Sequence, residues 1–242
     1  MTDYAVVIPA RLGSSRLARK PLLEIGGKPM IIHTWERGIE AAPAERVYVA
    51  TDSQEIFDVC AQYGAQAVMT DVACLTGTDR IASLTQTLPR DVYINLQGDE
   101  PMMPSANIRK IIEASLAAPD KIINGWAFIT EEDEFRSRTI PKVVIREDGQ
   151  LMYMSRASIP GTKSDEFIFS RKQICVYGFP RAALQAFAAR TEKTAHEEAE
   201  DIEILRFVEM GWDVTMIELS GASIAVDTPD DLERVRAKML KP

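Results

Sequence analysis

The chain has 242 residues, 46% of them hydrophobic, which is enough to bury a full core in one large domain. Lys and Arg total 28 against 36 for Asp and Glu, and the net charge of -8 argues against a general surface for nucleic acid or for an anionic membrane. No apolar run approaches the ~18 residues of a membrane span, and three widely spaced cysteines favour neither a disulfide framework nor a zinc site, so we expect a cytoplasmic protein.

In the first half of the chain, apolar runs of strand length alternate with amphipathic stretches of helical length. This alternation is typical of repeated βαβ units and a parallel sheet. We expect strands at Ala5–Pro9, Arg46–Thr51, Gln66–Met69 and Val92–Leu96. The expected helices are Pro29–Ala41, Gln54–Tyr63, Thr78–Thr87 and a stretch from after Pro104 to Leu116. Both prolines suit the first turn of a helix, where a missing amide hydrogen is tolerated.

The pattern changes from about residue 124 to residue 179, where shorter strands separated by polar turns predict an inserted antiparallel element. Within it we expect strands at Lys142–Arg146 and Leu151–Ser155, joined by a turn at residues 147–149. Helical periodicity returns at Arg181–Ala189 and Glu200–Met210, followed by a strand at Asp213–Glu218 and a helix from Pro229. Because no linker or repeat interrupts the chain, residues 1–242 are expected to form a single α/β domain.

A basic loop follows the first expected strand. It reads Arg-Leu-Gly-Ser-Ser-Arg-Leu-Ala-Arg-Lys over residues 11–20 and carries Arg11, Arg16, Arg19 and Lys20. Approachable backbone amides with nearby cations suit a triphosphate, although charge runs usually face water and a solvated turn is the alternative. Because ligands bind beyond the carboxyl ends of parallel strands, the placement favours a nucleotide-binding loop.

Two acidic motifs could supply a metal site. Asp99 lies in Asn-Leu-Gln-Gly-Asp-Glu-Pro, at the end of the fourth expected strand, and Mg²⁺ takes one or two carboxylates together with phosphate oxygens. A purely structural turn would also explain this motif. Asp227 precedes Thr-Pro-Asp-Asp, which reads as a helix start capped by Asp227 or Thr228. Capping leaves the Asp227 carboxylate available to reach the same metal as Asp99.

Two weaker motifs support a nucleotide pocket. Ala-Thr-Asp ends the second expected strand at Asp52, and Leu-Thr-Gly-Thr-Asp-Arg spans residues 75–80. The second motif reads as a turn followed by a helix with Thr78 as its cap. Such a motif is most often only a cap, but it could also present hydroxyls and amides to a base or ribose.

Taken in order, these blocks resemble the sugar-activating cytidylyltransferases, and specifically the 3-deoxy-manno-octulosonate (Kdo) cytidylyltransferase family of CMP-Kdo synthetases. The matching blocks span nearly the whole chain: Ile-Pro-Ala-Arg, Lys-Pro-Leu, Gly-Lys-Pro-Met-Ile, Ala-Thr-Asp, Gly-Thr-Asp-Arg, Gln-Gly-Asp-Glu-Pro-Met, Ser-Arg-Ala-Ser-Ile-Pro and Val-Asp-Thr-Pro. The resemblance implies a Rossmann-like nucleotidyltransferase fold with a mixed, mostly parallel sheet, an inserted antiparallel dimerisation element and a homodimer. It also implies transfer of CMP from CTP to the anomeric hydroxyl of an acidic eight-carbon sugar, with release of pyrophosphate, for lipopolysaccharide biosynthesis.

The resemblance also implies roles for particular residues, in a reaction that depends mainly on positioning and charge stabilisation. It implies CTP contacts from Ala10, Arg11, Arg16 and Lys20, with Arg16 and Lys20 on the phosphates, and pocket positions for Thr78, Arg80 and Gln97. It implies that Asp99 and Asp227 hold Mg²⁺ and, together with Arg16 and Lys20, form the catalytic set. On the sugar side it implies Arg156, Gln173, Tyr177 and Glu203.

The chain departs from the family pattern on its sugar side. Gln173 stands where Kdo enzymes have a histidine, and Ile204 replaces the glutamine of Glu-Gln-Leu-Arg. Because mispaired buried polar groups discriminate strongly between substrates, the changes suggest a modified sugar such as 8-amino-8-deoxy-Kdo (8-amino-3,8-dideoxy-manno-octulosonate). A carboxylate such as that of Glu203, or one from the acidic run over residues 197–203, could bind its ammonium. The alternative is neutral change in an ordinary Kdo enzyme.

A third departure lies in the basic loop, where Ala18 and Arg19 replace a Pro-Gly pair and add a cation. Two further interpretations remain open at this point. One is a CMP-sugar synthetase for another acidic sugar, such as a sialic acid. The other is a non-catalytic nucleotide-binding module on the same fold, since fold does not dictate function. Such a module would not need Lys20, Asp99 and Asp227 in these positions.

Overall fold

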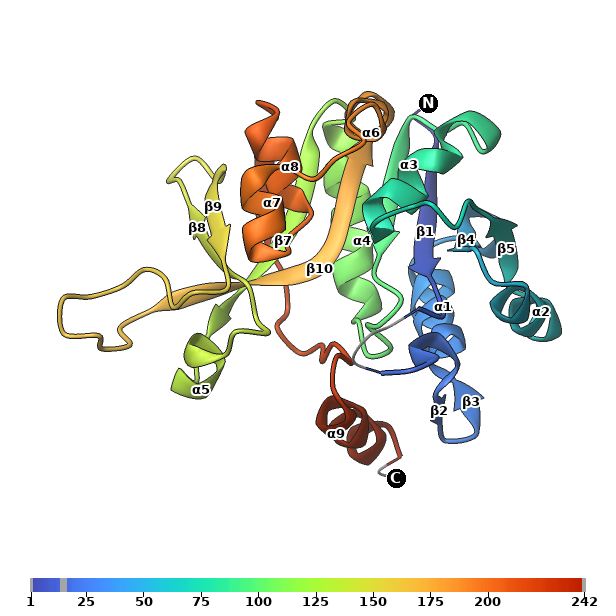
Figure 1. Cartoon of the computed structure of the whole chain (residues 1–242), viewed down its shortest axis with the longest axis horizontal. Helices are drawn as coiled ribbons and strands as arrows, with labels where there is room; N and C mark the ends of the chain where they lie inside the picture. The colour runs from blue at the N-terminus through green and yellow to red at the C-terminus, as the bar shows by residue number, and fades with distance from the viewer. Residues whose placement is uncertain (1, 14–16, 241–242) are drawn as a thin grey trace.

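The computed structural model describes residues 2–13 and 17–240 of the chain. A mixed sheet runs through the centre with helices on both faces (Figure 1). Its seven main strands follow the order β11-β7-β10-β6-β1-β4-β5. Their bounds are β1 (Tyr4–Ala10), β4 (Val47–Thr51), β5 (Gln66–Met69), β6 (Val92–Leu96), β7 (Ile122–Ile129), β10 (Ser170–Pro180) and β11 (Val214–Glu218). All neighbouring pairs are parallel except the two that involve β10, so the predicted mixed, mostly parallel sheet is confirmed.

The core lies on both sides of this sheet. In β1 every residue after Tyr4 is buried, as expected of a central parallel strand that helices cover on both faces. Val6 and Ile8 pack into one hydrophobic cluster, whereas Ala5 and Val7 pack into the other, because successive side chains of a strand point to opposite faces.

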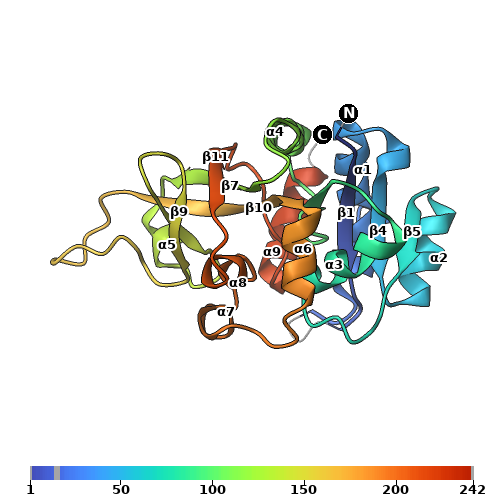
Figure 2. The same cartoon turned by 90° about the horizontal axis from the view of Figure 1, so that it is seen from above.

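The helices divide between these two clusters, and Figure 2 shows the two layers edge-on. One layer contains α1 (Met30–Ala41), α2 (Gln54–Gln62) and α4 (Ser105–Ala117), and the other contains α3 (Gly77–Thr87), α6 (Arg181–Ala188) and α8 (Ile204–Glu209). Of the helices in the described part of the chain, none combines the length and apolarity needed to cross a membrane.

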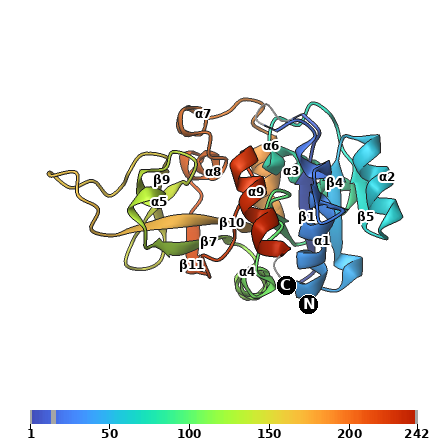
Figure 3. The same cartoon turned by 90° about the horizontal axis from the view of Figure 1, so that it is seen from below.

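A third, smaller cluster lies below the end of the sheet, where the C-terminal helix α9 (Pro229–Met239) packs near the N-terminal half of the chain (Figure 3). The N-terminal segment contributes η1 (Lys20–Leu22), β2 (Glu24–Ile25) and β3 (Lys28–Pro29). Ile25 and Met30 contact Val226, Leu232 and Val235 in this cluster. Chain segments about two hundred residues apart therefore meet beside the carboxyl end of β1.

Helix starts differ from the predicted ones. Pro29 and Pro104 are the N-cap residues of α1 and α4 and precede the first helical turn. The cap of α3 is Thr76, since its hydroxyl accepts from the Asp79 amide while the Asp79 carboxylate accepts from the Thr76 amide. The prediction of Thr78 as cap is therefore wrong. The reciprocal capping box gives the amides of Thr76 and Asp79 their acceptors, and so the helix is capped two residues earlier.

The helix predicted at Glu200–Met210 is shorter, since α8 begins at Ile204 and Glu200 is the last residue of the preceding helix α7 (Ala195–Glu200). Asp201 separates them with a φ of 51°, in the left-handed region that ends a helix. The apolar residues of α8 pack into the core, whereas the buried residue of α7 is Glu197, so the apolar pattern of α8 does not continue into α7.

The antiparallel insertion is shorter than the predicted segment 124–179. Its outer strands β7 and β10 belong to the central sheet, where β10 pairs with both β6 and β7. The remainder comprises α5 (Glu132–Arg136), the hairpin β8 (Lys142–Ile145) and β9 (Leu151–Ser155), and a loop over residues 156–169 that projects to the left in Figure 1. The last element, η2 (Ala44–Arg46), precedes β4.

Candidate active site

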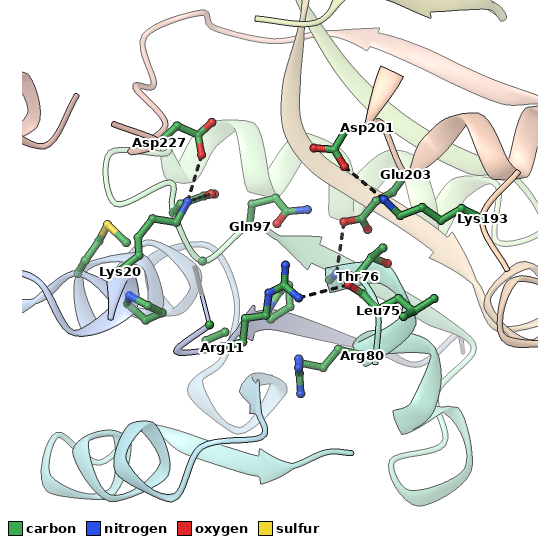
Figure 4. A pocket seen from close by; sticks show the side chains of 18 residues that line it. Arg11, Lys20, Leu75, Thr76, Arg80, Gln97, Lys193, Asp201, Glu203 and Asp227 are labelled. Atoms are coloured by element: carbon green, nitrogen blue, oxygen red, sulfur yellow. Dashed lines mark hydrogen bonds and ion pairs between the residues drawn. The ribbon is translucent and has the colours of Figure 1, made fainter. Parts of the chain in front are cut away.

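Two adjoining cavities open at the carboxyl ends of β1 and β6. Here β4 lies on one side of β1 and β6 on the other, and such a reversal of strand order is where open α/β sheets bind ligands. The first cavity has a volume of about 300 Å³ and lies between the end of β1 and the start of α3 (Figure 4). The second has a volume of about 610 Å³ and lies toward β10 and the insertion. Both are lined by Gln97, Asp201, Glu203 and Asp227.

The ammonium of Lys20 joins two carboxylates in the first cavity. Lys20 Nζ lies 2.7 Å from Asp99 Oδ2 and 3.2 Å from Asp227 Oδ1, and the two carboxylate side chains are 25% and 24% exposed. Burial by itself lowers the pKa of Lys20, but Asp99 and Asp227 outweigh it and raise the pKa above its usual value. The lysine is therefore charged at neutral pH and offsets the repulsion between the carboxylates.

Close backbone packing brings Asp99 to this point. The turn after β6 approaches β1 so closely that a Cβ on Gly98 would lie 2.6 Å from the Pro9 carbonyl oxygen. The Gly98 carbonyl accepts from the hydroxyl of Thr34 at 3.1 Å. Only glycine allows this approach.

Asp227 reaches the same point from the other end of the chain. The Val226 amide donates to the Asp99 carbonyl at 2.9 Å, which ties the two segments together. Thr228 caps α9 in a capping box with Asp231. The cap thus uses the residue after Asp227, and the Asp227 carboxylate contacts Lys20.

The donor set limits which metal could be held here. Among residues 2–13 and 17–240, no group of three or more His, Cys, Asp or Glu side chains is arranged to hold a metal ion. Two carboxylates that converge on one cation do fit a hard ion whose remaining ligands are phosphate and water oxygens, as Mg²⁺ prefers. They do not fit a structural zinc ion, which needs four protein ligands.

Glu100 is a buried acid that the sequence motifs did not single out. It lines the second cavity, is 4% exposed and accepts a hydrogen bond from the Ser223 hydroxyl. Burial raises the pKa of Glu100 to about 8, with a further contribution from Asp99 and Asp227. Glu100 is therefore mostly neutral at pH 7 and adds little charge beside the two aspartates.

Most, but not all, of the residues expected to bind the nucleotide line the first cavity. Ala10, Arg11, Lys20, Arg80 and Gln97 line the first cavity, and Arg11 Nη1 donates to the Leu75 carbonyl at 3.3 Å. Arg16 lies outside the described residues.

Arg80 and Thr78 have structural partners. The Arg80 side chain is 2% exposed, and its Nη2 lies 2.7 Å from Asp52 Oδ2. Thr78 is also buried, and its amide donates to Glu203 Oε2 at 2.8 Å. The carboxylate of the Ala-Thr-Asp motif thus holds Arg80 in place.

All four residues expected to approach the sugar line the second cavity: Arg156, Gln173, Tyr177 and Glu203. The Arg156 guanidinium donates to the carbonyls of Glu200 at 2.6 Å and Asp201 at 2.9 Å. Gln173 Nε2 donates to Asn124 Oδ1 at 3.2 Å. Burial raises the pKa of Tyr177 well above its usual value, so its phenol stays protonated.

Glu203 has an additional contact that the sequence did not predict. Its carboxylate accepts from the amides of Gly77 at 3.3 Å and Thr78 at 2.8 Å, which are unpaired donors at the N-terminus of α3. Burial raises the pKa of Glu203, while its bonds with Thr78 act in the opposite direction. Glu203 thus stabilises α3 at the boundary between the cavities, and this bonding engages the oxygens that were expected to meet the sugar.

Lys193 was also missed by sequence reasoning, and Asp201 was considered only as a member of the acidic run over residues 197–203. Both line the first cavity, and Lys193 Nζ lies 3.4 Å from Asp201 Oδ1 (Figure 4). They lie just before α7 and just after it, in irregular backbone. No motif or periodicity marks such positions.

Comparison with known proteins gives full-length matches. A family model described as cytidylyltransferase matches residues 5–217. The chain is 35% identical to a 3-deoxy-manno-octulosonate cytidylyltransferase from Escherichia coli, over 99% of this chain and 97% of that protein. It is 39% identical to the protein of the same name from Polynucleobacter necessarius, over 97% of this chain and 94% of that protein.

Solved structures give the same result. The structure of CMP:2-keto-3-deoxy-manno-octonic acid synthetase complexed with CTP has a TM-score of 0.90 and 35% sequence identity, over 98% of both chains. A cytidylyltransferase from Leptospira borgpetersenii has a TM-score of 0.64 at 15% identity, over 98% of this chain and 86% of that one. The second likeness shows a shared fold.

The contact between Glu203 and α3 leads to a prediction about stability. Glu203→Ala leaves two amides at the helix N-terminus without their acceptor, so we expect the free energy of unfolding to fall by about 1–2 kcal/mol. Urea denaturation measures this loss. Glu198→Ala, at an exposed position of α7, is the matched control and should change stability by less than ~0.5 kcal/mol. Equal stability of the two variants would refute the capping role.

Proposed function

The chain belongs to the 3-deoxy-manno-octulosonate cytidylyltransferase family, and we propose that it transfers CMP from CTP to the anomeric hydroxyl of Kdo or a modified Kdo, releasing pyrophosphate. It is a nucleotidyltransferase by family, as the motif blocks predicted. The observation that carries the proposal is Lys20 between Asp99 and Asp227, where the two cavities meet. A binding module would not require this arrangement.

The two cavities suit the two substrates. The first is lined by Arg11 and Lys20, whose charges would offset those of a triphosphate. The second would hold the sugar, with its anomeric hydroxyl toward Gln97 and Asp227 at the shared boundary. Lys20 would stabilise negative charge on the transferred phosphate, and the enclosing walls would align the reacting oxygen with it.

We assign the metal role to Asp99 and Asp227, which would hold Mg²⁺. When bound, the ion would offset charge on the α-phosphate and on the departing pyrophosphate. Two aspartates that approach one cation are already suited to a divalent ion, and Lys20 would then be available to the phosphates. Glu100, mostly neutral at pH 7, adds little competing charge.

The metal role predicts that Asp99→Asn lowers the rate of pyrophosphate release by about 100-fold or more, because one anionic ligand becomes neutral. A coupled pyrophosphate assay with CTP and Kdo, across a Mg²⁺ titration, measures the effect. Glu113→Gln, an equally conservative change at an exposed position of α4, should leave the rate within about twofold. Wild-type turnover in Asp99→Asn would disprove the metal role.

The charges around the second cavity support an amino sugar. Besides Glu100, which is mostly neutral at pH 7, six acidic residues line it against three basic ones: Asp133, Glu134, Asp201, Glu203, Asp227 and Asp231 against Arg156, Lys172 and Arg234. Lys172 pairs with Glu134 at 2.6 Å. In the described part of the chain the Asp133 carboxylate forms no hydrogen bond or ion pair, and Glu203 is bonded to α3. We therefore propose 8-amino-8-deoxy-Kdo as the preferred acceptor, with Asp133 as the partner of its ammonium.

This proposal predicts a kcat/KM for 8-amino-8-deoxy-Kdo at least about tenfold above that for Kdo, since one charge-assisted hydrogen bond supplies about 1.5–3 kcal/mol. Asp133→Asn should reduce the preference severalfold and leave Kdo turnover unchanged, whereas exposed Asp120→Asn should change neither. Initial rates are measured with Kdo, with the amino sugar and with a sialic acid, each with CTP and with UTP. They distinguish an amino-Kdo enzyme from an ordinary Kdo enzyme and from a synthetase for another acidic sugar. A clear preference for Kdo would identify an ordinary Kdo enzyme.

An exposed apolar patch supports a homodimer. Phe128 on β7 and Phe169 beside β10 are each 50% exposed, and neighbouring Ile168 is 71% exposed. The guanidinium of Arg171 lies 4.8 Å from the Trp126 ring centroid and 5.7 Å from that of Phe128. Aromatic and arginine side chains in a contiguous patch are typical of protein interfaces. We propose that a second copy of the chain covers this surface.

Dimerisation through this patch predicts that Phe128→Glu converts the protein to a monomer in light scattering at micromolar concentration, because the new carboxylate would be buried without a partner. Tyr63→Glu, at an exposed position after α2, should leave the mass of the particle unchanged. A monomeric wild-type protein would contradict the proposal.

We further propose that the product serves lipopolysaccharide biosynthesis and that the protein acts in the cytoplasm. The family relationship supports the pathway. The presence of CTP in the cytoplasm and three unpaired cysteines support the location. Cell fractionation would test it, and recovery of the protein in a membrane or secreted fraction would refute it.

A further inference from the structure

Lys142 is buried with none of its surface exposed. Lys142 Nζ donates to three backbone carbonyls, those of Ser137 at 2.5 Å, Ile140 at 2.7 Å and Arg156 at 2.9 Å. Within the described residues its ammonium forms no ion pair. An ammonium has three N–H donors, so all of its hydrogen bonds are made.

The three carbonyls belong to two separate segments. Ser137 and Ile140 lie between α5 and β8, and Arg156 follows β9. Ser137, Thr139, Ile140 and Arg156 all line the second cavity. Lys142, the first residue of β8, lies opposite Ser155 of β9 and Lys172 of β10. It therefore lies behind the cavity wall and joins its two halves.

Burying the ammonium of Lys142 costs free energy that an apolar side chain at this position would not. Transfer of an ammonium from water into a protein interior is unfavourable, and an apolar side chain of similar volume is often at least as stabilising as a buried charge. Three carbonyl oxygens directed at one point would leave acceptors unsatisfied if the donor were absent. The bonds from Lys142 are therefore one of two ties between these segments; the other is the Arg156 guanidinium, whose Nη1 donates to the carbonyls of Arg138 at 3.2 Å and Thr139 at 3.4 Å.

We propose that Lys142 is a positioning residue for the acceptor, in that its ammonium holds residues 137–140 and Arg156 where the second cavity binds the acid sugar. The inference deepens the proposed function and rests on it for the identity of this cavity as the acceptor site. Lys142 itself does not reach the substrate; it acts through the carbonyls that it holds.

The protonation of Lys142 supports this role. Burial, together with the nearby charges of Arg138 and Arg156, lowers the pKa of Lys142 to about 8, while Glu200 acts in the opposite direction. The remaining facing cation is Lys172 on β10, which pairs with Glu134. Above that pH the neutral amine has two N–H donors for three carbonyls, so the wall loses one of its bonds.

Deprotonation of Lys142 weakens the cavity wall, but the same shift in its pKa makes the whole fold more stable as the pH rises. The folded pKa lies below the unfolded value of 10.5, so the unfolded state binds more protons between pH 8 and 10.5. Over this window Lys142 makes the free energy of unfolding increase with pH. If the wall loosens above pH 8, global unfolding caused by the titration of Lys142 is therefore not the reason.

The first test compares Lys142→Met with Lys110→Met, the same change at an exposed position of α4. Using CTP and Kdo as probes, we expect the KM for Kdo to rise about tenfold or more in Lys142→Met, because a displaced wall loses substrate contacts. The KM for CTP and the kcat should stay within about twofold, as should all three parameters in Lys110→Met. Unchanged KM for Kdo, or an equal rise in both KM values, would overturn the inference.

The second test needs no variant and decides the matter even if Lys142→Met does not fold. Hydrogen exchange of the wild-type enzyme, corrected for intrinsic rates, is followed from pH 7 to 9.5. We expect residues 137–141 and 156–158 to lose protection above pH about 8 while β1 and β6 keep theirs. Constant protection in these segments would overturn the inference. Absence of turnover in the wild-type enzyme would instead overturn the proposed function, so the two failures are distinguishable.

Discussion

The contact between Lys20, Asp99 and Asp227 is the constraint on which the site depends. Asp99 and Asp227 lie 128 residues apart, and without a cation between them their carboxylates would repel. Bringing them together requires the close packing of Gly98 on β1 and the bond from the Val226 amide to the Asp99 carbonyl. The same charge arrangement that stabilises the apo site would accept a divalent ion and a triphosphate.

Helix α3 connects this centre to the sugar side. Glu203 contacts its N-terminal amides, and Asp79 of its capping box lies 3.1 Å from the guanidinium of Arg206. Arg206 is fully buried and also pairs with Glu197 at 2.6 Å. Glu203 lines both cavities and is bonded directly to α3, so a change at this carboxylate reaches the start of the helix through a hydrogen bond.

Elements encoded by neighbouring residues were predicted well from the sequence. The strands at Gln66–Met69 and Val92–Leu96 have the predicted bounds, and the strand at Ala5–Pro9 extends by one residue at each end. The start of α9 also has a local cause, since Thr228 and Asp231 form the capping box themselves. The wrong cap of α3 and the wrong start of α8 have local causes, in a capping box and in the left-handed Asp201, whereas the extent of the insertion was decided by long-range contacts. The first and last strands of the predicted insertion joined the central sheet because β10 pairs with β6, whose residues lie about eighty positions earlier.

The sequence by itself determined the order of strands and helices, the family, and the cationic and acidic motifs of the site, because hydrophobic periodicity, caps and short motifs are properties of adjacent residues. Only the tertiary structure decided which charges are partnered. In that structure Arg80 forms an ion pair with Asp52, Glu203 accepts hydrogen bonds at the N-terminus of α3, and Lys142 donates to three carbonyls. A buried polar group must find its partner wherever packing brings one within hydrogen-bond distance, and that distance is unrelated to separation along the chain.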